Sequence, residues 1–216
     1  MLLDETQLER TLTEGLGVPV IITISEDAMD HRQLSAGEMQ RFTELKTTPR
    51  RRSWLRGRHA LKRLLVRMGE SDDTSSISFP HSRFSLTHAA SYALAAGAHA
   101  ACTIAGIGVD LELDRFPHPR SARFFLSPAE QEWVHGLPEA TQTTQLLRLW
   151  TVKEALFKSD PENLNTMLYD YCLDAPEAQS GSARRLGNET VRIRYLSVAT
   201  ERGFLTVAVY PAKTSC

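Results

Sequence analysis

A weak internal repeat constrains the fold of this chain more than any other feature. SAGE, at Ser35, precedes a basic helical segment, and SPAE, at Ser127, precedes a second helical segment. The hairpin-like sequence SLTHAASYALAAG similarly aligns with SVATERGFLTVAV, which begins at Ser197. Such self-similarity indicates two copies of one supersecondary unit, although matches this weak also arise by chance. We expect two similar α+β halves, residues 1–105 and 106–216, with a ligand cleft between them.

Composition adds only broad limits. The 216 residues are 42% hydrophobic and have a formal net charge of −1. Such a chain can bury a sizeable core, and its charge balance excludes a uniformly basic coat protein for nucleic acid. It has no apolar run of membrane-spanning length, MLLDETQLER lacks the charged and apolar regions typical of a signal peptide, and its three cysteines match no metal or redox spacing. We therefore expect a cytoplasmic protein with neither a membrane nor a nucleic-acid partner.

Local patterns predict a mixture of helices and strands. Ser35 with Glu38, and Ser127 with Glu130, have the spacing of capping boxes, which start helices. Hydrophobic periodicity predicts a long helix over 141–158, and β-branched runs indicate strands. The expected strands are 18–24, 103–113, 168–173, 191–198 and 204–210, with a hairpin over 83–97 and a loop over 175–189.

A basic segment lies between Lys46 and Arg67. It contains nine Lys and Arg residues and no Asp or Glu. Its leucines recur at helical spacing, which predicts an amphipathic helix with cations on its solvent side. Two interpretations stay open here: a solvated helix face, or a site for phosphate groups of a nucleic acid or a small molecule.

Two carboxylates end the predicted strand in GIGVDLELD. Asp110 and Glu112 are two residues apart, so that both side chains lie on one face of a strand. Adjacent carboxylates repel each other unless a cation or a shared proton holds them, and Mg²⁺ prefers such oxygen ligands. Gly106 and Gly108 indicate a close approach of another backbone. A solvated strand end is the alternative.

A second charged set lies in WTVKEALFK, from Trp150 to Lys158. Glu154 and Lys158 are one helical turn apart, roughly opposite the apolar stripe of the helix. A surface ion pair would explain them as well. His88, in SLTHAA, is a third candidate, and hydrogen bonding within the fold is the ordinary role of such a histidine.

Together these segments resemble the 4′-phosphopantetheinyl transferase superfamily. The motifs GIGVDLE and WTVKEALFK carry the resemblance, and FSLTHAASYALAA, RRSWLRGRHALKRLL and FFLSPAEQEW are similar to further family segments. The two-half pattern resembles the surfactin-synthetase-activating (Sfp) type, a monomer of two fused units with pseudo-twofold symmetry. The resemblance implies transfer of the phosphopantetheine arm of coenzyme A to a serine of an apo acyl, aryl or peptidyl carrier protein, with adenosine 3′,5′-bisphosphate as the second product.

The resemblance also implies roles for individual residues. Three carboxylates would hold Mg²⁺, with Glu154 as the general base and Lys158 stabilising the transition state or the leaving group. The implied metal ligands are Asp110, Glu112 and Glu154, and the implied coenzyme A contacts are Arg52, Arg58, Thr87, His88, Asp110, Lys153 and Lys158. Among these contacts, Arg52 is the one that the resemblance places at the 3′-phosphate. Arg56, Lys62 and Arg63 are expected on a solvated face or against the carrier protein.

Other functions stay open at this point. Another Mg²⁺-dependent phosphoryl or nucleotidyl transferase could use the same acidic pair, although the chain has no Walker-type phosphate loop. A nucleic-acid-binding module on 50–67 would leave the carboxylates unexplained, and an inactive carrier-protein binder would not need the complete acidic set. Two details depart from the family: Thr87 stands where serine is common, and SDPENLNTMLYDY replaces a glycine-containing segment after Lys158.

Overall fold

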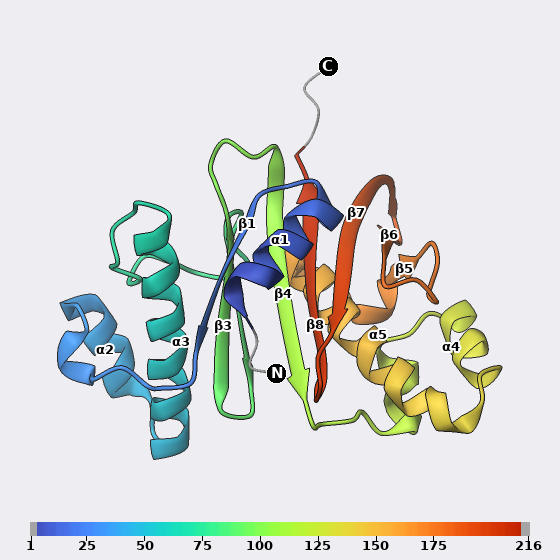
Figure 1. The fold of residues 1–216 in the computed structure, drawn as a ribbon, viewed down its shortest axis with the longest axis horizontal. Helices are drawn as coiled ribbons and strands as arrows, with labels where there is room; N and C mark the ends of the chain where they lie inside the picture. Colours follow the sequence, from blue (N-terminus) through green and yellow to red (C-terminus); the bar gives the residue numbers. More distant parts are fainter. Residues whose placement is uncertain (1–3, 213–216) are drawn as a thin grey trace.

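The chain folds into antiparallel β-sheets flanked by helices, as Figure 1 shows for a computed structural model that describes residues 4–212. This is the α+β class that the sequence predicts. The helices are α1 (Glu5–Leu16), α2 (Ala36–Glu44), α3 (Thr48–Arg67), α4 (Pro128–His135) and α5 (Glu139–Ser159), with short 3₁₀-helices at His31–Gln33, Pro119–Phe124, Asn163–Asn165 and Leu168–Asp170. The strands are β1 (Val20–Ser25), β2 (Phe84–Ala89), β3 (Tyr92–Ala98), β4 (Ile104–Leu113), β5 (Tyr171–Leu173), β6 (Ser180–Arg185), β7 (Asn188–Ala199) and β8 (Gly203–Pro211).

The strands form two sheets from consecutive parts of the chain. The first has the order β1-β3-β2, and the second has the order β4-β8-β7-β6-β5. In the first sheet, β1 precedes the helix pair α2–α3 and pairs with β3, the second strand of the later hairpin, so that Val20 lies opposite Ala98. In the second sheet, β4 precedes the helix pair α4–α5 and pairs with β8, the second strand of its later hairpin, so that Ile107 lies opposite Val209. The order strand, two helices, hairpin therefore occurs twice, with β5 and β6 inserted in the second occurrence.

The two sheets meet where β2 lies beside β4. Ser85 Oγ accepts a hydrogen bond from the backbone N–H of Val109 at 3.0 Å. Thr87 Oγ1 accepts one from the N–H of Leu111 at 3.4 Å. Side-chain hydroxyls of β2 thus satisfy backbone donors of β4, because buried N–H groups need partners. This junction places the first hairpin against the strand that carries Asp110.

Helices cover both faces of the sheets. Because consecutive strand residues point to opposite faces, Leu94 of β3 packs with Leu12 of α1, whereas its neighbour Ala95 packs with Leu64 of α3. The cluster under α1 also contains residues of β1, β4 and β8, so that α1 joins the two sheets (Figure 1). Each fully buried leucine contributes about 1.5–3 kcal/mol to the free energy of unfolding.

The helix pair α2–α3 is fastened by a buried ion pair that begins at its capping box. Glu38 completes the predicted box with Ser35 and also contacts Lys62 Nζ at 3.0 Å. It accepts a further hydrogen bond from the backbone N–H of Thr74 at 3.0 Å, and Lys62 donates to the carbonyl of Asp72 at 2.9 Å. We call this set the Glu38 clamp, and it ties the start of α2 to α3 and to the loop after α3.

The helix pair α4–α5 has the same device. Glu130 completes the predicted box with Ser127 and contacts Lys153 Nζ at 2.7 Å. It accepts a hydrogen bond from the N–H of Leu173 at 2.9 Å, and Lys153 donates to the carbonyl of Tyr171. This Glu130 clamp repeats the Glu38 clamp contact for contact and in the same chain order.

Three parts of the predicted secondary structure need correction. The expected loop 175–189 contains β6, which pairs with β7, because pairing to a neighbouring strand outweighs the low strand propensity of SGSARR. The expected strand 168–173 begins with a 3₁₀ turn and is a strand only at Tyr171–Leu173. The sequence reading also missed α1, whose Asp4 cap and buried leucines are clear in the structure.

Two compositional expectations can be compared with the described residues. Within residues 4–212, no helix combines the length and apolar character needed to cross a membrane. Cys102 and Cys172 are free thiols. Cys216 lies outside the described residues.

Candidate functional site

Asp110, on β4, is the centre of the candidate site. Its side chain is almost completely buried, and Oδ1 accepts hydrogen bonds from Thr87 Oγ1 at 3.0 Å and Lys158 Nζ at 2.7 Å. Oδ2 is buried and has no hydrogen-bond partner among the described residues. Buried polar atoms are nearly always paired, so this oxygen marks a place where a ligand would be favoured.

The close approach expected from Gly106 and Gly108 is confirmed. A Cβ atom on Gly106 would lie 1.9 Å from the carbonyl oxygen of Ser159, and one on Gly108 would lie 1.9 Å from that of Ala155. Only glycine therefore allows the last turns of α5 to pack directly on the backbone of β4. This contact brings the α5 side chains to Asp110.

Glu154 and Lys158, both on α5, lie on the side facing Asp110. Lys158 Nζ lies 3.7 Å from Glu154 Oε2, so that one ammonium group contacts two carboxylates. Burial raises the pKa of Glu154; the charge of Lys158 lowers it and that of Asp110 raises it. Glu154 is therefore a carboxyl group whose environment favours proton uptake, which suits a general base.

Glu112 lies two residues beyond Asp110 on the same face of β4. Burial raises the pKa of Glu112, and the negative charge of Asp110 raises it further. A hydrogen bond from Trp150 acts in the opposite direction. The carboxylates of this site therefore repel one another, and a bound cation would favour their ionised forms.

The donor chemistry of the site fits a divalent cation. Asp110, Glu112 and Glu154 offer only oxygen atoms, which Mg²⁺ prefers, and Oδ2 of Asp110 is buried without a partner. Within the described part of the chain, however, no group of three Asp, Glu, His or Cys side chains is arranged to hold a metal ion. The three residue types thus suit Mg²⁺. In this arrangement, Asp110 is bound to Lys158.

Thr87 is placed differently from its expected contact with a phosphate. Its one hydroxyl hydrogen is donated to Asp110 Oδ1, and its oxygen accepts from the N–H of Leu111. Thr87 is also buried. A hydroxyl has a single donor, so this threonine holds Asp110 in place and has no hydrogen left for a phosphate.

His88, the next residue on β2, is exposed at the site. Partial desolvation lowers the pKa of His88, a hydrogen bond with the backbone of Ser53 raises it, and nearby cations, foremost Arg58, lower it again. The imidazole lies against α3 at Gly57, where a Cβ atom would be only 2.6 Å from Nε2. The sequence reading missed Gly57, although a lone glycine inside a helix signals a close contact.

Arg58 lines a cavity of about 430 Å³ between α3, β2 and the end of α5. Lys158 lines the same cavity, together with apolar residues such as Leu86 and Phe157. Arg58 is only 7% exposed, and its Nε has no partner among the described residues. The cavity is therefore lined by one cation from α3, one cation from α5 and several apolar side chains. Arg52 lies earlier on α3 and is exposed to solvent.

Lys153 contradicts the expectation that it contacts coenzyme A. Its ammonium group is fully buried and is bound to Glu130 and to the carbonyl of Tyr171 in the Glu130 clamp. Burial lowers the pKa of Lys153, although Glu130 raises it. A signal was present in the sequence, because Lys153 stands one helical turn from both Leu149 and Leu156 of the apolar stripe.

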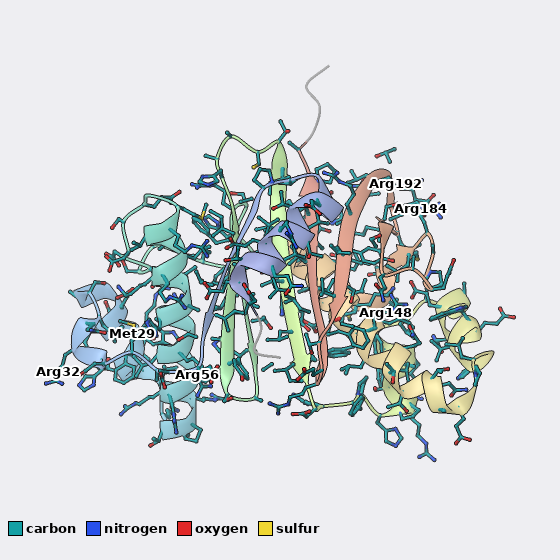
Figure 2. The ribbon with its side chains drawn as sticks, viewed as in Figure 1. Met29, Arg32, Arg56, Arg148, Arg184 and Arg192 are labelled. Carbon is teal, nitrogen blue, oxygen red and sulfur yellow. The ribbon has the colours of Figure 1, made fainter. Side chains whose placement is uncertain are left out.

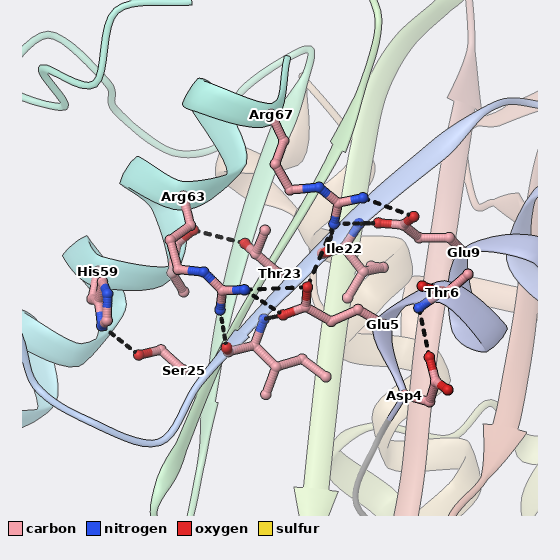
Figure 3. A network of polar contacts seen from close by, with 12 residues as sticks. Asp4, Glu5, Thr6, Glu9, Ile22, Thr23, Ser25, His59, Arg63 and Arg67 are labelled. Carbon is pink, nitrogen blue, oxygen red and sulfur yellow. Dashed lines mark hydrogen bonds and ion pairs between the residues drawn. The ribbon is translucent and has the colours of Figure 1, made fainter. Parts of the chain in front are cut away.

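The expected solvated face of α3 is wrong for Arg56 and Lys62, which are buried. Arg56, which is labelled in Figure 2, donates to the carbonyl of Glu26 at 2.9 Å, and Lys62 belongs to the Glu38 clamp. Figure 3 shows Arg63 and Arg67 reaching across β1 to two glutamates of α1.

The network in Figure 3 covers the open edge of β1. Arg63 donates to the carbonyl of Ile24 at 2.5 Å and lies 3.1 Å from Glu5. The same Glu5 accepts the N–H of Ile24 at 2.7 Å. Side chains thus replace the missing neighbour strand, which protects an edge from further pairing. Both arginines thus have structural partners within the fold.

Comparison with known proteins agrees with the geometry. A sequence model of the 4′-phosphopantetheinyl transferase superfamily matches residues 106–201. The matched segment includes β4 with Asp110 and Glu112, and α5 with Glu154 and Lys158. The match supports that superfamily and, in general terms, a transferase of phosphopantetheine. No curated protein matches the chain.

Proposed function

We propose that this protein transfers the 4′-phosphopantetheine moiety of coenzyme A to a serine hydroxyl of an apo acyl, aryl or peptidyl carrier protein. The observation that carries the proposal is Asp110, with a buried unpaired oxygen between Thr87 and Lys158 inside the segment that matches the superfamily. The products would be the holo-carrier and adenosine 3′,5′-bisphosphate. The free Cys102 and Cys172 suit a reducing compartment such as the cytoplasm.

Asp110, Glu112 and Glu154 are the residues that would hold Mg²⁺. When bound there, the ion would polarise and neutralise the pyrophosphate of coenzyme A. Thr87 keeps Asp110 in position through its hydroxyl hydrogen bond at 3.0 Å. The cation would offset the mutual repulsion of the three carboxylates.

Glu154 is the proposed base for the serine nucleophile. It accepts the serine proton while the serine oxygen forms a bond to the β-phosphorus of coenzyme A. The bond from that phosphorus to the oxygen bridging the two phosphates breaks, and adenosine 3′,5′-bisphosphate leaves with the electron pair. Lys158, which contacts Glu154 and Asp110, would stabilise the charge that develops on the leaving oxygen.

Three further side chains would bind the phosphates of coenzyme A. His88 is exposed beside the site, Arg58 lines the cavity that also contains Lys158, and Arg52 is exposed on the same helix as Arg58. Lys153 has no part in this proposal, because its ammonium group is enclosed in the Glu130 clamp.

We also propose that the chain consists of two related halves, residues 1–105 and 106–216, in the manner of the surfactin-synthetase-activating type. The repeated order of strand, helix pair and hairpin supports this division, and so do the two clamps. The candidate site would then lie between the halves, since Thr87 comes from one and Asp110 from the other.

The decisive experiment measures the mass of a carrier protein. Incubation of the protein with coenzyme A, Mg²⁺ and a panel of apo acyl, aryl and peptidyl carriers should raise the mass of at least one carrier by a phosphopantetheine arm. Glu154→Gln should lower the transfer rate at least a hundredfold, because it removes the base. Glu132→Gln, an exposed site on α4, is the matched control and should transfer normally. Unchanged masses across the whole panel would refute the transferase.

A further inference from the structure

Thr74 links the Glu38 clamp to the candidate site. Its hydroxyl donates to Glu38 Oε1 at 2.5 Å and accepts a hydrogen bond from Arg58 Nη1 at 3.1 Å. A hydroxyl has one hydrogen. Because Thr74 donates that hydrogen to Glu38, the lone pairs of its oxygen face Arg58. Thr74 is fully buried, so water does not compete for either bond.

The second clamp shows that this hydroxyl is not needed for the clamp itself. Leu173 occupies the position that corresponds to Thr74, and its backbone N–H bonds to Glu130 at 2.9 Å just as that of Thr74 bonds to Glu38. The side chain of Leu173 offers no hydroxyl, yet the ion pair of Glu130 forms. The Thr74 hydroxyl is therefore an addition found in the first clamp, and its partner is Arg58.

Arg58 is held but incompletely satisfied. Nη1 is bound to Thr74, the guanidinium lies 5.2 Å from the centre of the Trp54 ring, and Nε is buried without a partner among the described residues. The side chain lines the 430 Å³ cavity that Lys158 also lines. A buried cation with an unused donor at a cavity wall suits an anionic ligand group.

We infer that Thr74, oriented by Glu38, positions Arg58 to bind the ribose 3′-phosphate of coenzyme A. The inference rests on the proposed function. Coenzyme A carries a pyrophosphate and a 3′-phosphate; the pyrophosphate reacts and belongs beside Asp110 and Lys158. The 3′-phosphate is then a ligand for the cations of α3, and Arg58 is the one of them that lines the cavity. Thr74 is thus a positioning residue that sets the preference for coenzyme A over 3′-dephospho-coenzyme A.

Thr74→Val tests this role, because it keeps the shape of the side chain and removes the hydroxyl. The KM for coenzyme A should rise about three- to tenfold, the effect of one lost hydrogen bond, with kcat unchanged. The KM for 3′-dephospho-coenzyme A should stay the same, so that the preference between the two substrates shrinks. Thr74→Ser should restore the wild-type preference, and Thr43→Val, at an exposed threonine of α2, should leave both substrates unaffected.

A double-mutant cycle separates positioning from general damage. Thr74→Val added to Arg58→Gln should not weaken coenzyme A binding further, because the group it positions is gone. Binding is measured by calorimetry with both forms of the coenzyme, so it does not depend on turnover. Additive losses, or a Thr74→Val protein that keeps the full preference, would overturn the inference. If wild type binds coenzyme A with this preference but modifies no carrier, the proposed transferase fails while the role of Thr74 stands.

Discussion

At the scale of single residues, hydrogen-bond counting decides which groups are free to do chemistry. Thr87 donates its only hydroxyl hydrogen to Asp110, and the buried ammonium group of Lys153 is bound to Glu130. Neither group can therefore donate a hydrogen bond to a phosphate in this arrangement. Asp110 and Arg58, in contrast, each keep a buried polar atom without a partner among the described residues. These two unsatisfied atoms belong to the residues for which we propose ligands.

Glu154 should make the metal-free protein less stable at neutral pH. Its folded-state pKa is raised by burial above the ordinary 4.5. Below that ordinary value both folded and unfolded states are protonated, and the carboxyl has no effect. As the pH rises through the ordinary pKa, the unfolded state loses its proton first, which lowers the free energy of unfolding until the folded-state pKa is passed.

Glu154→Gln removes this cost. In chelator-treated buffer at neutral pH, the variant should melt at a higher temperature than wild type, and the difference should vanish near pH 4. Thermal melts at both pH values, with Glu132→Gln as the neutral comparison, measure the effect. A lower melting temperature for Glu154→Gln at neutral pH would contradict the proposed environment of this carboxyl.

At the scale of elements, the contact of α5 with β4 assembles the site. Gly106 and Gly108 let the backbone of α5 contact the backbone of β4. Because the helix packs this close to the strand, Lys158 Nζ reaches Asp110 Oδ1 at 2.7 Å. The partner in each contact is a backbone atom, which cannot rotate away as a side chain can. The position of the helix is therefore sensitive to a single methyl group.

Gly108→Ala should destabilise the protein by about 2–4 kcal/mol. The added Cβ would stand 1.9 Å from the carbonyl of Ala155 and 2.5 Å from the N of Ser159, so the helix must move. Transfer activity should fall with stability, because Lys158 is displaced from Asp110. Gly136→Ala, where the nearest atoms are 3.5 Å away, should change the free energy of unfolding by less than about 0.5 kcal/mol. Denaturant titration of both variants checks this, and equal stability of the two would contradict it.

At the scale of the whole molecule, the two sheets share one core. The apolar cluster under α1 combines strands of both sheets, and hydroxyls of β2 bond the backbone of β4. The two sheets thus bury against each other surfaces that either sheet alone would leave exposed. This arrangement makes a second copy of the chain unnecessary for completing the candidate site.

The protein should therefore be a monomer. Light scattering coupled to size exclusion should give a mass of about 24.2 kDa over a wide range of concentration. Addition of coenzyme A and Mg²⁺ should not change this mass, since both sides of the proposed site come from one chain. A stable trimer would contradict the two-half organisation.

Patterns that act over short stretches of sequence were predicted well. Both capping boxes, the close approach at Gly106 and Gly108, and the strand that carries Asp110 follow from neighbours within a few residues or from side-chain size. The prediction failed where the partner was distant. β6 is a strand because β7 lies beside it, and the arginines of α3 meet glutamates from α1, more than 50 residues away in the chain.

The sequence by itself determined the type of chemistry: acidic residues two apart on a strand, and a glutamate and lysine one turn apart on a helix. Only the tertiary structure decided which lysine lies beside Asp110, because Lys153 and Lys158 occupy the same helix and differ in what packs against them. Helix and strand periodicity arises from local backbone geometry, which the sequence encodes directly. The partner of a charged group depends instead on which distant segment the core brings to it, since burial, rather than propensity, sets its surroundings.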